Sequence, residues 1–235
     1  MAQFMVMILA NEAAEGQLSP ADTQSLVEGH AAYERSLRQA SAYLDGERLR
    51  PSAEGKRVTV RDERARIEPG PFGDVALTGY YVVEAPDLDA AVALAGKCPV
   101  SEGTALDVRP LMKGRIKPEK ASHPGRVFAF AVLGNAPSET AWVDVMDRMD
   151  GGPREDFPAD RFLGGVRLLP PSQGRHVSHR GGHRAVLDGP FLESKEVIGG
   201  LFFMRMASIE EAVIWSRGTD HVRHGGVEIR ELWRS

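Results

Sequence analysis

The chain has 235 residues, of which 42% are hydrophobic and 26% are charged, values that are ordinary for a globular protein. Its net charge of −4 offers no basic excess for a nucleic-acid footprint, and no apolar run approaches the ~20 residues that a membrane span needs. The single cysteine, Cys98, excludes an intrachain disulfide and any site built from several thiolates. We therefore expect a cytoplasmic protein that binds neither nucleic acid nor membrane.

The first half of the chain predicts an alternation of strands and helices. Its apolar opening lacks a basic leading region, which is typical of a buried strand rather than a signal peptide. Ser19 before Pro20 indicates a helix start, and polar–apolar alternation around Asp62-Glu63 indicates a β-hairpin. The expected elements are a strand at 4–9, a helix at 20–42, a strand at 44–49, hairpin strands at 56–61 and 64–68, a strand at 80–83, a helix at 87–95 and a strand at 105–110.

The second half predicts the same order of elements. They are a strand at 127–133, a shorter helix from 139 to about 149, a strand at 162–168, a hairpin around Gly181-Gly182, a strand at 201–206, a helix at 209–217 and a strand at 227–232.

Matching residues support a tandem duplication. Gly70-Pro71-Phe72 recurs as Gly189-Pro190-Phe191, and Asp107-Val108-Arg109 recurs as Glu228-Ile229-Arg230. The offsets between the copies change only inside loops and the first helix, as expected for a diverged repeat. We therefore predict one domain at 1–111, a Lys- and Pro-rich linker at 112–125 and a second domain at 126–235.

A short motif in the second half carries a family resemblance. Asp188-Gly189-Pro190-Phe191 forms a tight turn and is followed by Glu193 and Lys195, whereas the first half has an eroded Pro-Gly-Pro-Phe-Gly-Asp at 69–74. The motif resembles the signature of the DGPF (YCII-related) family, whose members share a ferredoxin-like α+β fold and mostly lack an assigned activity.

The resemblance implies that each half is a ferredoxin-like βαββαβ domain with an added β-hairpin. Such a domain carries both helices on one face of its sheet, so the other face needs a partner. Single-copy relatives bury that face by dimerising sheet to sheet. We expect the two halves of this chain to pack likewise as a pseudo-dimeric α/β barrel, so that the protein is a monomer acting as a pseudo-dimer, or a homodimer.

The charged residues of the motif loop are the first candidates for chemistry. Asp188, Glu193 and Lys195 can line a cleft and supply proton-handling groups, with Phe191 as a ligand contact. The structural alternative is a tight turn followed by solvated charges. If the loop is catalytic, the second half carries the reaction and the first half is its scaffold.

His30, in the first helix, is a further catalytic candidate. Some YCII relatives carry a histidine near this position that is thought to pair with an aspartate. The nearest acids here are Glu28, Glu34 and Asp45, and none falls clearly at the family position. A lone histidine on a helix is more often a packing residue, so both interpretations stay open.

Two arginines at equivalent positions, Arg48 and Arg167, are candidates for ligand binding. Strand alternation can point them into the barrel, where a guanidinium group holds a carboxylate or an enolate. The alternative places both side chains along the surface.

The sequence favours neither a metal site nor a cofactor. His176, His179 and His183 gather in one hairpin, but positions 176 and 179 of a strand face opposite sides, and no third ligand is evident for the other pair. Solvated histidines are the favoured interpretation. The chain also lacks the G-x-S-x-G, P-loop and dinucleotide-binding motifs.

Two functional hypotheses follow. By analogy with enzymes of related barrels, the first is cofactor-independent acid/base chemistry on a small organic molecule, of the isomerase, lyase or dehydrohalogenase type. The second is a non-catalytic ligand-binding or regulatory module. Because relatives are often encoded beside sigma factors, a link to a stress response fits this second hypothesis.

Overall fold

The computed structural model describes residues 1–116, 125–134, 160–181, 183–188, 197–223 and 225–233, with the backbone alone for 113–116 and 188. Contacts divide the chain into two compact units that cross the boundary between the repeats. Unit 1 consists of Met1–Arg48, Phe72–Leu111 and Pro171–Phe191, and unit 2 of Leu49–Pro71, Met112–Pro170 and Leu192–Ser235. The domain limits expected from the repeat stay a prediction about the sequence.

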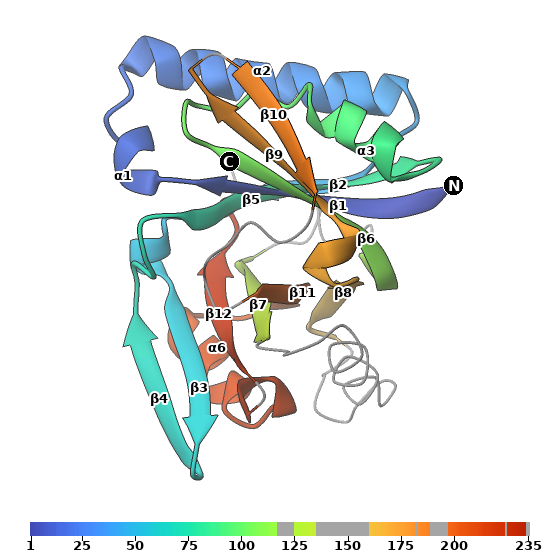
Figure 1. Ribbon diagram of the computed structural model, residues 1–235. Helices are drawn as coiled ribbons and strands as arrows, with labels where there is room; N and C mark the ends of the chain where they lie inside the picture. The colour runs from blue at the N-terminus through green and yellow to red at the C-terminus, as the bar shows by residue number, and fades with distance from the viewer. Residues whose placement is uncertain (117–124, 135–159, 182, 189–196, 224, 234–235) are drawn as a thin grey trace. The chain divides into compact units, whose positions relative to one another are not determined.

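Unit 1 is an antiparallel sheet covered by helices (Figure 1). Its strands lie in the order β2-β5-β1-β6-β9-β10. Their bounds are Tyr43–Arg48, Ala76–Ala85, Ala2–Ala10, Ala105–Ile116, Arg175–Arg180 and His183–Asp188. β6 runs to Ile116 and so enters the segment at 112–125 that was expected to be a linker.

The helices of unit 1 follow from their sequence signals. α2 (Pro20–Gln39) begins at the Ser19 cap, whose side chain accepts a hydrogen bond from the Asp22 amide. α3 (Leu88–Ala95) begins in the same way at Asp87. A short helix, α1 (Glu12–Glu15), was missed by the sequence prediction, and a 3-10 turn spans Pro171–Gln173. With α2 between β1 and β2 and α3 between β5 and β6, the order β2-β5-β1-β6 is that of a ferredoxin-like α+β fold.

Unit 2 repeats this architecture. Its strands lie in the order β8-β11-β7-β12-β3-β4, again antiparallel, with bounds Phe162–Leu168, Val197–Arg205, Val127–Gly134, Gly225–Glu231, Lys56–Arg61 and Arg64–Pro69. α6 (Ile209–Ser216) is capped by Ser208, and 3-10 turns span Ser52–Glu54 and Asp220–Arg223. The helix expected at 139–149 lies outside the described residues. Among the helices of the described ranges, none has the length and apolarity needed to cross a bilayer.

Each unit therefore contains the hairpin of the other repeat. β3–β4 follows β2 in the chain, yet β3 pairs with β12 of the second repeat, and β9 of the second repeat pairs with β6 of the first. The hairpins contribute to the cores: Val58 of β3 is 0% exposed and packs with the unit 2 core, and Val177 of β9 is 3% exposed and packs with the unit 1 core.

Strand alternation places the unit 1 core on the helix-covered side of its sheet. Buried residues of β1, β5 and β6 at every second position pack against Tyr33 and Leu37 of α2 and against Ala91 of α3. The members from the strands are Phe4, Val6, Ile8, Tyr81, Val83, Ala85, Leu106 and Val108. The same face carries the candidate site.

Candidate functional site

α2 brings His30 to the helix-covered face of the unit 1 sheet. His30 lies three residues before Tyr33 and seven before Leu37, so the three side chains project from one side of the helix. Tyr33 and Leu37 are buried, whereas His30 is half-buried at the end of this stripe. Core packing of the helix thus fixes the position of the imidazole.

The partner of His30 is a tyrosine of β5. Nδ1 of His30 and the hydroxyl of Tyr81 are 3.0 Å apart and hydrogen-bonded, and the two rings are stacked with centroids 6.0 Å apart. Tyr33 meets Tyr81 edge to face at 5.1 Å and donates its own hydroxyl hydrogen to the Leu94 carbonyl at 3.0 Å. The Tyr81 ring is held from a further side by Gly46, where a Cβ atom would lie 2.5 Å from Cδ1.

Arg48 and Glu15 add charge to this site. Arg48, at the exposed end of β2, acts on the pKa values of both His30 and Glu15. Glu15 is half-buried and accepts a hydrogen bond from the Ser101 hydroxyl at 3.1 Å. We call His30, Tyr81, Arg48 and Glu15 the His30 cluster.

Burial decides the protonation states of the His30 cluster. It lowers the pKa of His30 to about 4, and the positive charge of Arg48 contributes to that lowering, so the imidazole is neutral at neutral pH. Burial also raises the pKa of Tyr81 far above neutrality, which keeps its hydroxyl protonated. The pKa of Glu15 is raised by burial, against the lowering effects of Ser101 and Arg48. The cluster therefore combines a neutral histidine, a phenol and an exposed cation.

A His–Asp dyad is not formed by the acids near His30 in the sequence. Asp45 is buried elsewhere and accepts a hydrogen bond from Tyr80 at 2.7 Å, and Tyr80 alternates with Tyr81 along β5. Glu34 forms an ion pair with Arg38, and Glu28 accepts a hydrogen bond from Gln24. The described contact of His30 is a phenol instead.

Comparison with known proteins places the chain in a family. The family model described as the YCII-related domain matches residues 2–113 and again residues 140–235. The chain belongs to the YCII-related family. The double match also confirms the tandem duplication expected from the sequence.

Individual relatives add little about activity. An uncharacterized protein of Rhizobium meliloti (strain 1021) is 34% identical over 90 residues, which are 37% of this chain and 73% of that protein, so it is about one repeat long. A solved structure described as a candidate chlorite dismutase has a TM-score of 0.39 and 13% identity, and the match covers 99% of this chain and 94% of that one. A likeness at this level transfers no reaction to the YCII-related chain.

The remaining predicted site residues belong to different units or lie outside the described residues. Arg167 is half-buried in β8 of unit 2, opposite Gly200 of β11, whereas Arg48 belongs to unit 1. Asp188 ends β10, a strand of unit 1, but its side chain is not described. Phe191, Glu193 and Lys195 lie outside the described residues, so their roles stay predictions.

The hairpin histidines do not form a metal site within the described part of the chain, where no group of three His, Cys, Asp or Glu side chains is placed to hold an ion. His179 lies 3.8 Å from a carboxylate oxygen of Glu102, and His183 pairs across the hairpin with Arg180. His176 faces Asp107 across the β9–β6 register.

Unit 2 carries an apolar counterpart of the His30 cluster. Phe202 holds the position equivalent to Tyr81 and stacks on Phe130, with ring centroids 4.7 Å apart. The Trp215 ring packs edge to face on Phe202, with centroids 5.9 Å apart. The ring of His221, in the 3-10 turn Asp220–Arg223, also packs on Phe202, with ring centroids 5.4 Å apart. The phenol that hydrogen-bonds histidine in unit 1 is thus replaced by a phenyl ring at this equivalent position.

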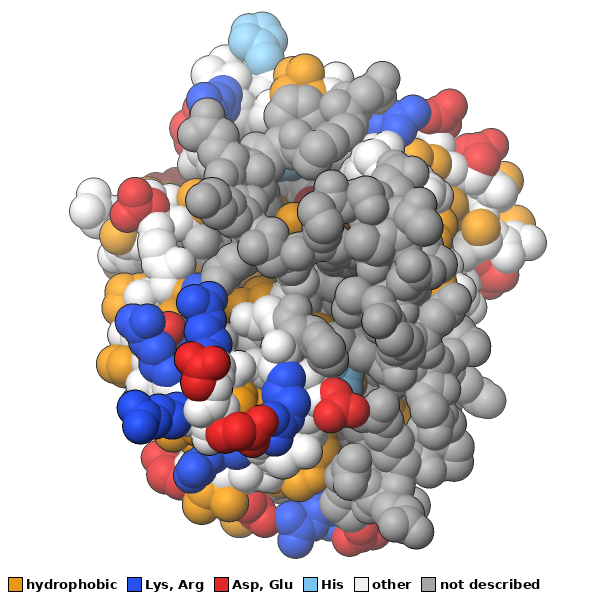
Figure 2. All heavy atoms as spheres, turned by 60° about the horizontal axis from the view of Figure 1, so that its bottom comes forward, with side chains coloured by type: hydrophobic (Ala, Val, Ile, Leu, Met, Phe, Trp, Pro, Cys, Tyr) orange, Lys and Arg blue, Asp and Glu red, His pale blue; other side chains and the backbone are white. Residues whose placement is uncertain are grey.

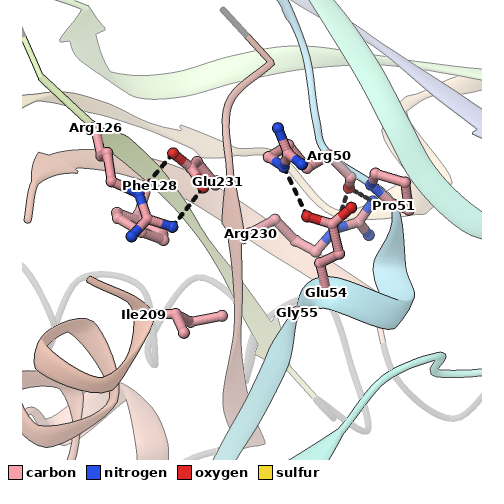
Figure 3. A pocket seen from close by; sticks show the side chains of 9 residues that line it. All are labelled: Arg50, Pro51, Glu54, Gly55, Arg126, Phe128, Ile209, Arg230 and Glu231. Carbon is pink, nitrogen blue, oxygen red and sulfur yellow. Dashed lines mark hydrogen bonds and ion pairs between the residues drawn. The ribbon is translucent and has the colours of Figure 1, made fainter. Parts of the chain in front are cut away.

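Unit 2 also contains a small hollow lined by arginines (Figure 3). Arg126 and Glu231 point toward one another and form two hydrogen bonds of 2.8 and 2.7 Å, and Arg50 pairs with Glu54 at 2.7 Å. The buried Arg230 donates from Nε to the Arg50 carbonyl at 2.8 Å. With a volume of about 40 Å³ and these guanidinium groups already paired, the hollow has room for a few waters rather than for an organic ligand.

Sequence reasoning missed Tyr81 and Glu15. The signal for Tyr81 was present, because alternation from the apolar residues of its strand puts it on the helix-covered face with His30. The signal for Glu15 was absent, since it depends on α1 folding back toward Ser101.

Proposed function

We propose that this YCII-related protein binds a small organic anion at the His30 cluster of unit 1 and exchanges a proton with it. The observation that carries the proposal is the 3.0 Å contact between His30 Nδ1 and the Tyr81 hydroxyl, together with the electrostatic effect of the exposed cation Arg48 on His30. A carboxylate suits Arg48 because a guanidinium group can bind it through two hydrogen bonds.

Ligand binding and proton transfer are coupled in this proposal. In the tautomer that donates from Nδ1 to the Tyr81 oxygen, Nε2 offers its lone pair to a proton of the ligand. Arg48 is one of the two causes that lower the pKa of His30. A ligand carboxylate paired with Arg48 offsets that charge, raises the pKa of His30 and makes the imidazole a better proton acceptor when the ligand is bound.

The motif loop belongs to the same proposal. β10 is a strand of unit 1 and leads directly into the loop, so Asp188, Glu193, Lys195 and Phe191 are proposed as further ligand contacts, and Arg167 as the second anion anchor. We propose that the units pair as a pseudo-dimeric α/β barrel within one chain. A native mass spectrum that gives a monomer supports this assembly, and one that gives a stable dimer means that the duplication did not replace assembly between chains.

Deuterium exchange tests the proton-transfer step. Pyruvate is an enolisable carboxylate, and the loss of its methyl proton signal in D2O is followed by NMR with and without the protein. We expect exchange above the buffer rate that falls by roughly 100-fold or more in His30→Gln and in Arg48→Met. Arg35→Met is the matched control, because Arg35 is exposed on α2, the helix that carries His30. This variant is expected to keep the wild-type rate.

Benzoate, which has no exchangeable carbon-bound proton beside its carboxylate, separates binding from chemistry. Calorimetric binding that depends on Arg48, combined with no pyruvate exchange, favours the non-catalytic ligand-binding alternative. Binding that is the same in Arg48→Met and in the wild type overturns the assignment of the site.

A further inference from the structure

The edge of each repeat accepts a hairpin from the other repeat through a shared pattern. In unit 1, Leu106 of β6 lies opposite Val177 of β9, and in unit 2 the equivalent Val227 of β12 lies opposite Val58 of β3. The two edges thus use the same register for different hairpins.

Glycine residues let both hairpins approach closely. A Cβ atom on Gly174 would lie 2.8 Å from Cγ of the buried Arg109, and one on Gly55 would lie 2.6 Å from Cδ of the buried Arg230. Each acceptor edge therefore presents a buried arginine that the incoming chain covers with a glycine. This feature is common to both edges and cannot tell the hairpins apart.

The residues at the centres of β3 and β9 also discriminate only weakly between the two edges. Arg57 of β3 donates to Glu228 of β12 at 3.2 Å, and the position equivalent to Arg57 is His176, opposite Asp107 of β6. Either basic residue is compatible with either acid, so exchanging the hairpins would preserve this pairing. Selectivity has to come from elsewhere.

The hairpin tips differ in charge. The tip of β3–β4 is Asp62-Glu63, and Glu63 forms an ion pair with Arg223 of unit 2 at 2.7 Å. The tip of β9–β10 is a glycine turn, where the Gly181 amide donates to Glu102 of unit 1 at 2.5 Å. The hairpin tip at the β12 edge thus places a carboxylate against an arginine, whereas the tip at the β6 edge places a backbone amide against a carboxylate.

A second contact reinforces the difference. Arg184 of β10 donates to the Cys98 carbonyl at 2.9 Å, beyond the end of α3. The equivalent position of the other hairpin is Ala65, which has no hydrogen to donate from its side chain. If β3–β4 occupied the β6 edge, Asp62-Glu63 would also lie near Glu102, and like charges so placed repel.

We propose that each repeat carries a docking edge selective for the hairpin of the other repeat, chosen by the charge at the hairpin tip. The partner that fits the β12 edge is a hairpin with an acidic tip, and the partner that fits the β6 edge is one with a glycine tip and an arginine on its outer strand. The repeats are therefore obligate partners rather than independent domains. On the face shown in Figure 2, Lys and Arg side chains lie among Asp and Glu side chains over the described residues.

Charge reversal in the full chain tests the selectivity. Hydrogen exchange read by mass spectrometry follows the amides of β12, in the second repeat, after Glu63→Arg in the first repeat. We expect Glu63→Arg and Arg223→Glu each to raise the local opening of β12 by roughly 3- to 10-fold, and the double reversal to return it to within about 2-fold of wild type. Arg66→Glu is the matched control, because Arg66 pairs with Glu68 of its own strand at 2.9 Å.

A reciprocal variant tests the other edge. Glu102→Arg is expected to raise exchange in β9, a strand of the second repeat, and to leave β3 unchanged. The proposal is overturned if Glu63→Arg changes exchange in β6 rather than in β12, or if the double reversal is as open as the sum of the single changes.

Discussion

The two units share a frame and differ in the chemistry of one core position. In unit 1 Tyr81 reaches His30 with its hydroxyl, whereas in unit 2 Phe202 occupies the equivalent position and packs against Phe130 and Trp215. The strand order and the hairpin exchange are the same in both. The two copies thus share the strand order and the hairpin exchange, on which the fold depends, and differ at a polar contact. We therefore expect the shared features to be structural and the unshared ones to be functional.

The largest expected effect tests the shared hairpin exchange. Val58→Asp and Val177→Asp each bury a carboxylate without a partner and are expected to cost roughly 3–5 kcal/mol of unfolding free energy in a denaturant titration. Hydrogen exchange should increase across the repeat boundary, in β12 for the first variant and in β6 for the second. Val186→Asp, at a position 53% exposed, should change stability by less than about 0.5 kcal/mol.

The next effect is specific to unit 1 and depends on pH. The pKa of His30 is about 4 in the folded chain, against 6.5 for an unperturbed histidine, so below pH 6.5 the unfolded chain takes up a proton that the folded chain does not. His30 therefore makes the protein lose stability as pH falls from about 6.5 to 4, by an amount on the order of 2–3 kcal/mol.

The measurement compares wild type with His30→Gln across that range, in which the variant should lose less stability. Asp107, whose pKa burial raises to about 6, and Glu15 change stability in the opposite sense and are common to both proteins. Parallel stability curves for the two proteins would contradict the burial of a neutral histidine.

A reciprocal pair of substitutions tests the position at which the units diverge. Phe202→Tyr places a hydroxyl in an aromatic cluster and is expected to cost about 1–3 kcal/mol, because the added hydroxyl loses its water on burial. Tyr81→Phe removes one hydrogen bond and is expected to cost about 0.5–1.5 kcal/mol. Equal costs of the two substitutions, measured by thermal unfolding, would contradict the expected difference between positions 81 and 202.

The smallest effect concerns a feature that the units share. Asp87 and Ser208 hold equivalent positions, and each caps a helix by accepting a hydrogen bond from the backbone three residues on, at Ala90 and Glu211. Replacing either cap with Ala is expected to cost about 1 kcal/mol in a denaturant titration, and the two costs should agree within about 0.5 kcal/mol. A clear inequality would show that the duplicated frames have diverged as well.

Local sequence signals were sufficient for most of the elements. The cap at Ser19, the helices Leu88–Ala95 and Ile209–Ser216, the strand at Phe162–Leu168 and both hairpins follow from turn residues and periodicity, which act over a few residues. The repeat also predicted the duplication that the family match confirms. Of the candidate site, His30 and Arg48 were identified by residue type and repeat position.

Tertiary structure decided the pairings between distant residues. Alternation predicts that β3 and β9 are half-buried strands, but both edges offer the same register, so periodicity does not assign a hairpin to the other repeat. The contact of His30 with Tyr81 likewise joins residues 51 positions apart, and Glu15 meets Ser101 across 86. Periodicity fixes which face a side chain occupies, whereas its neighbour on that face depends on how the elements pack.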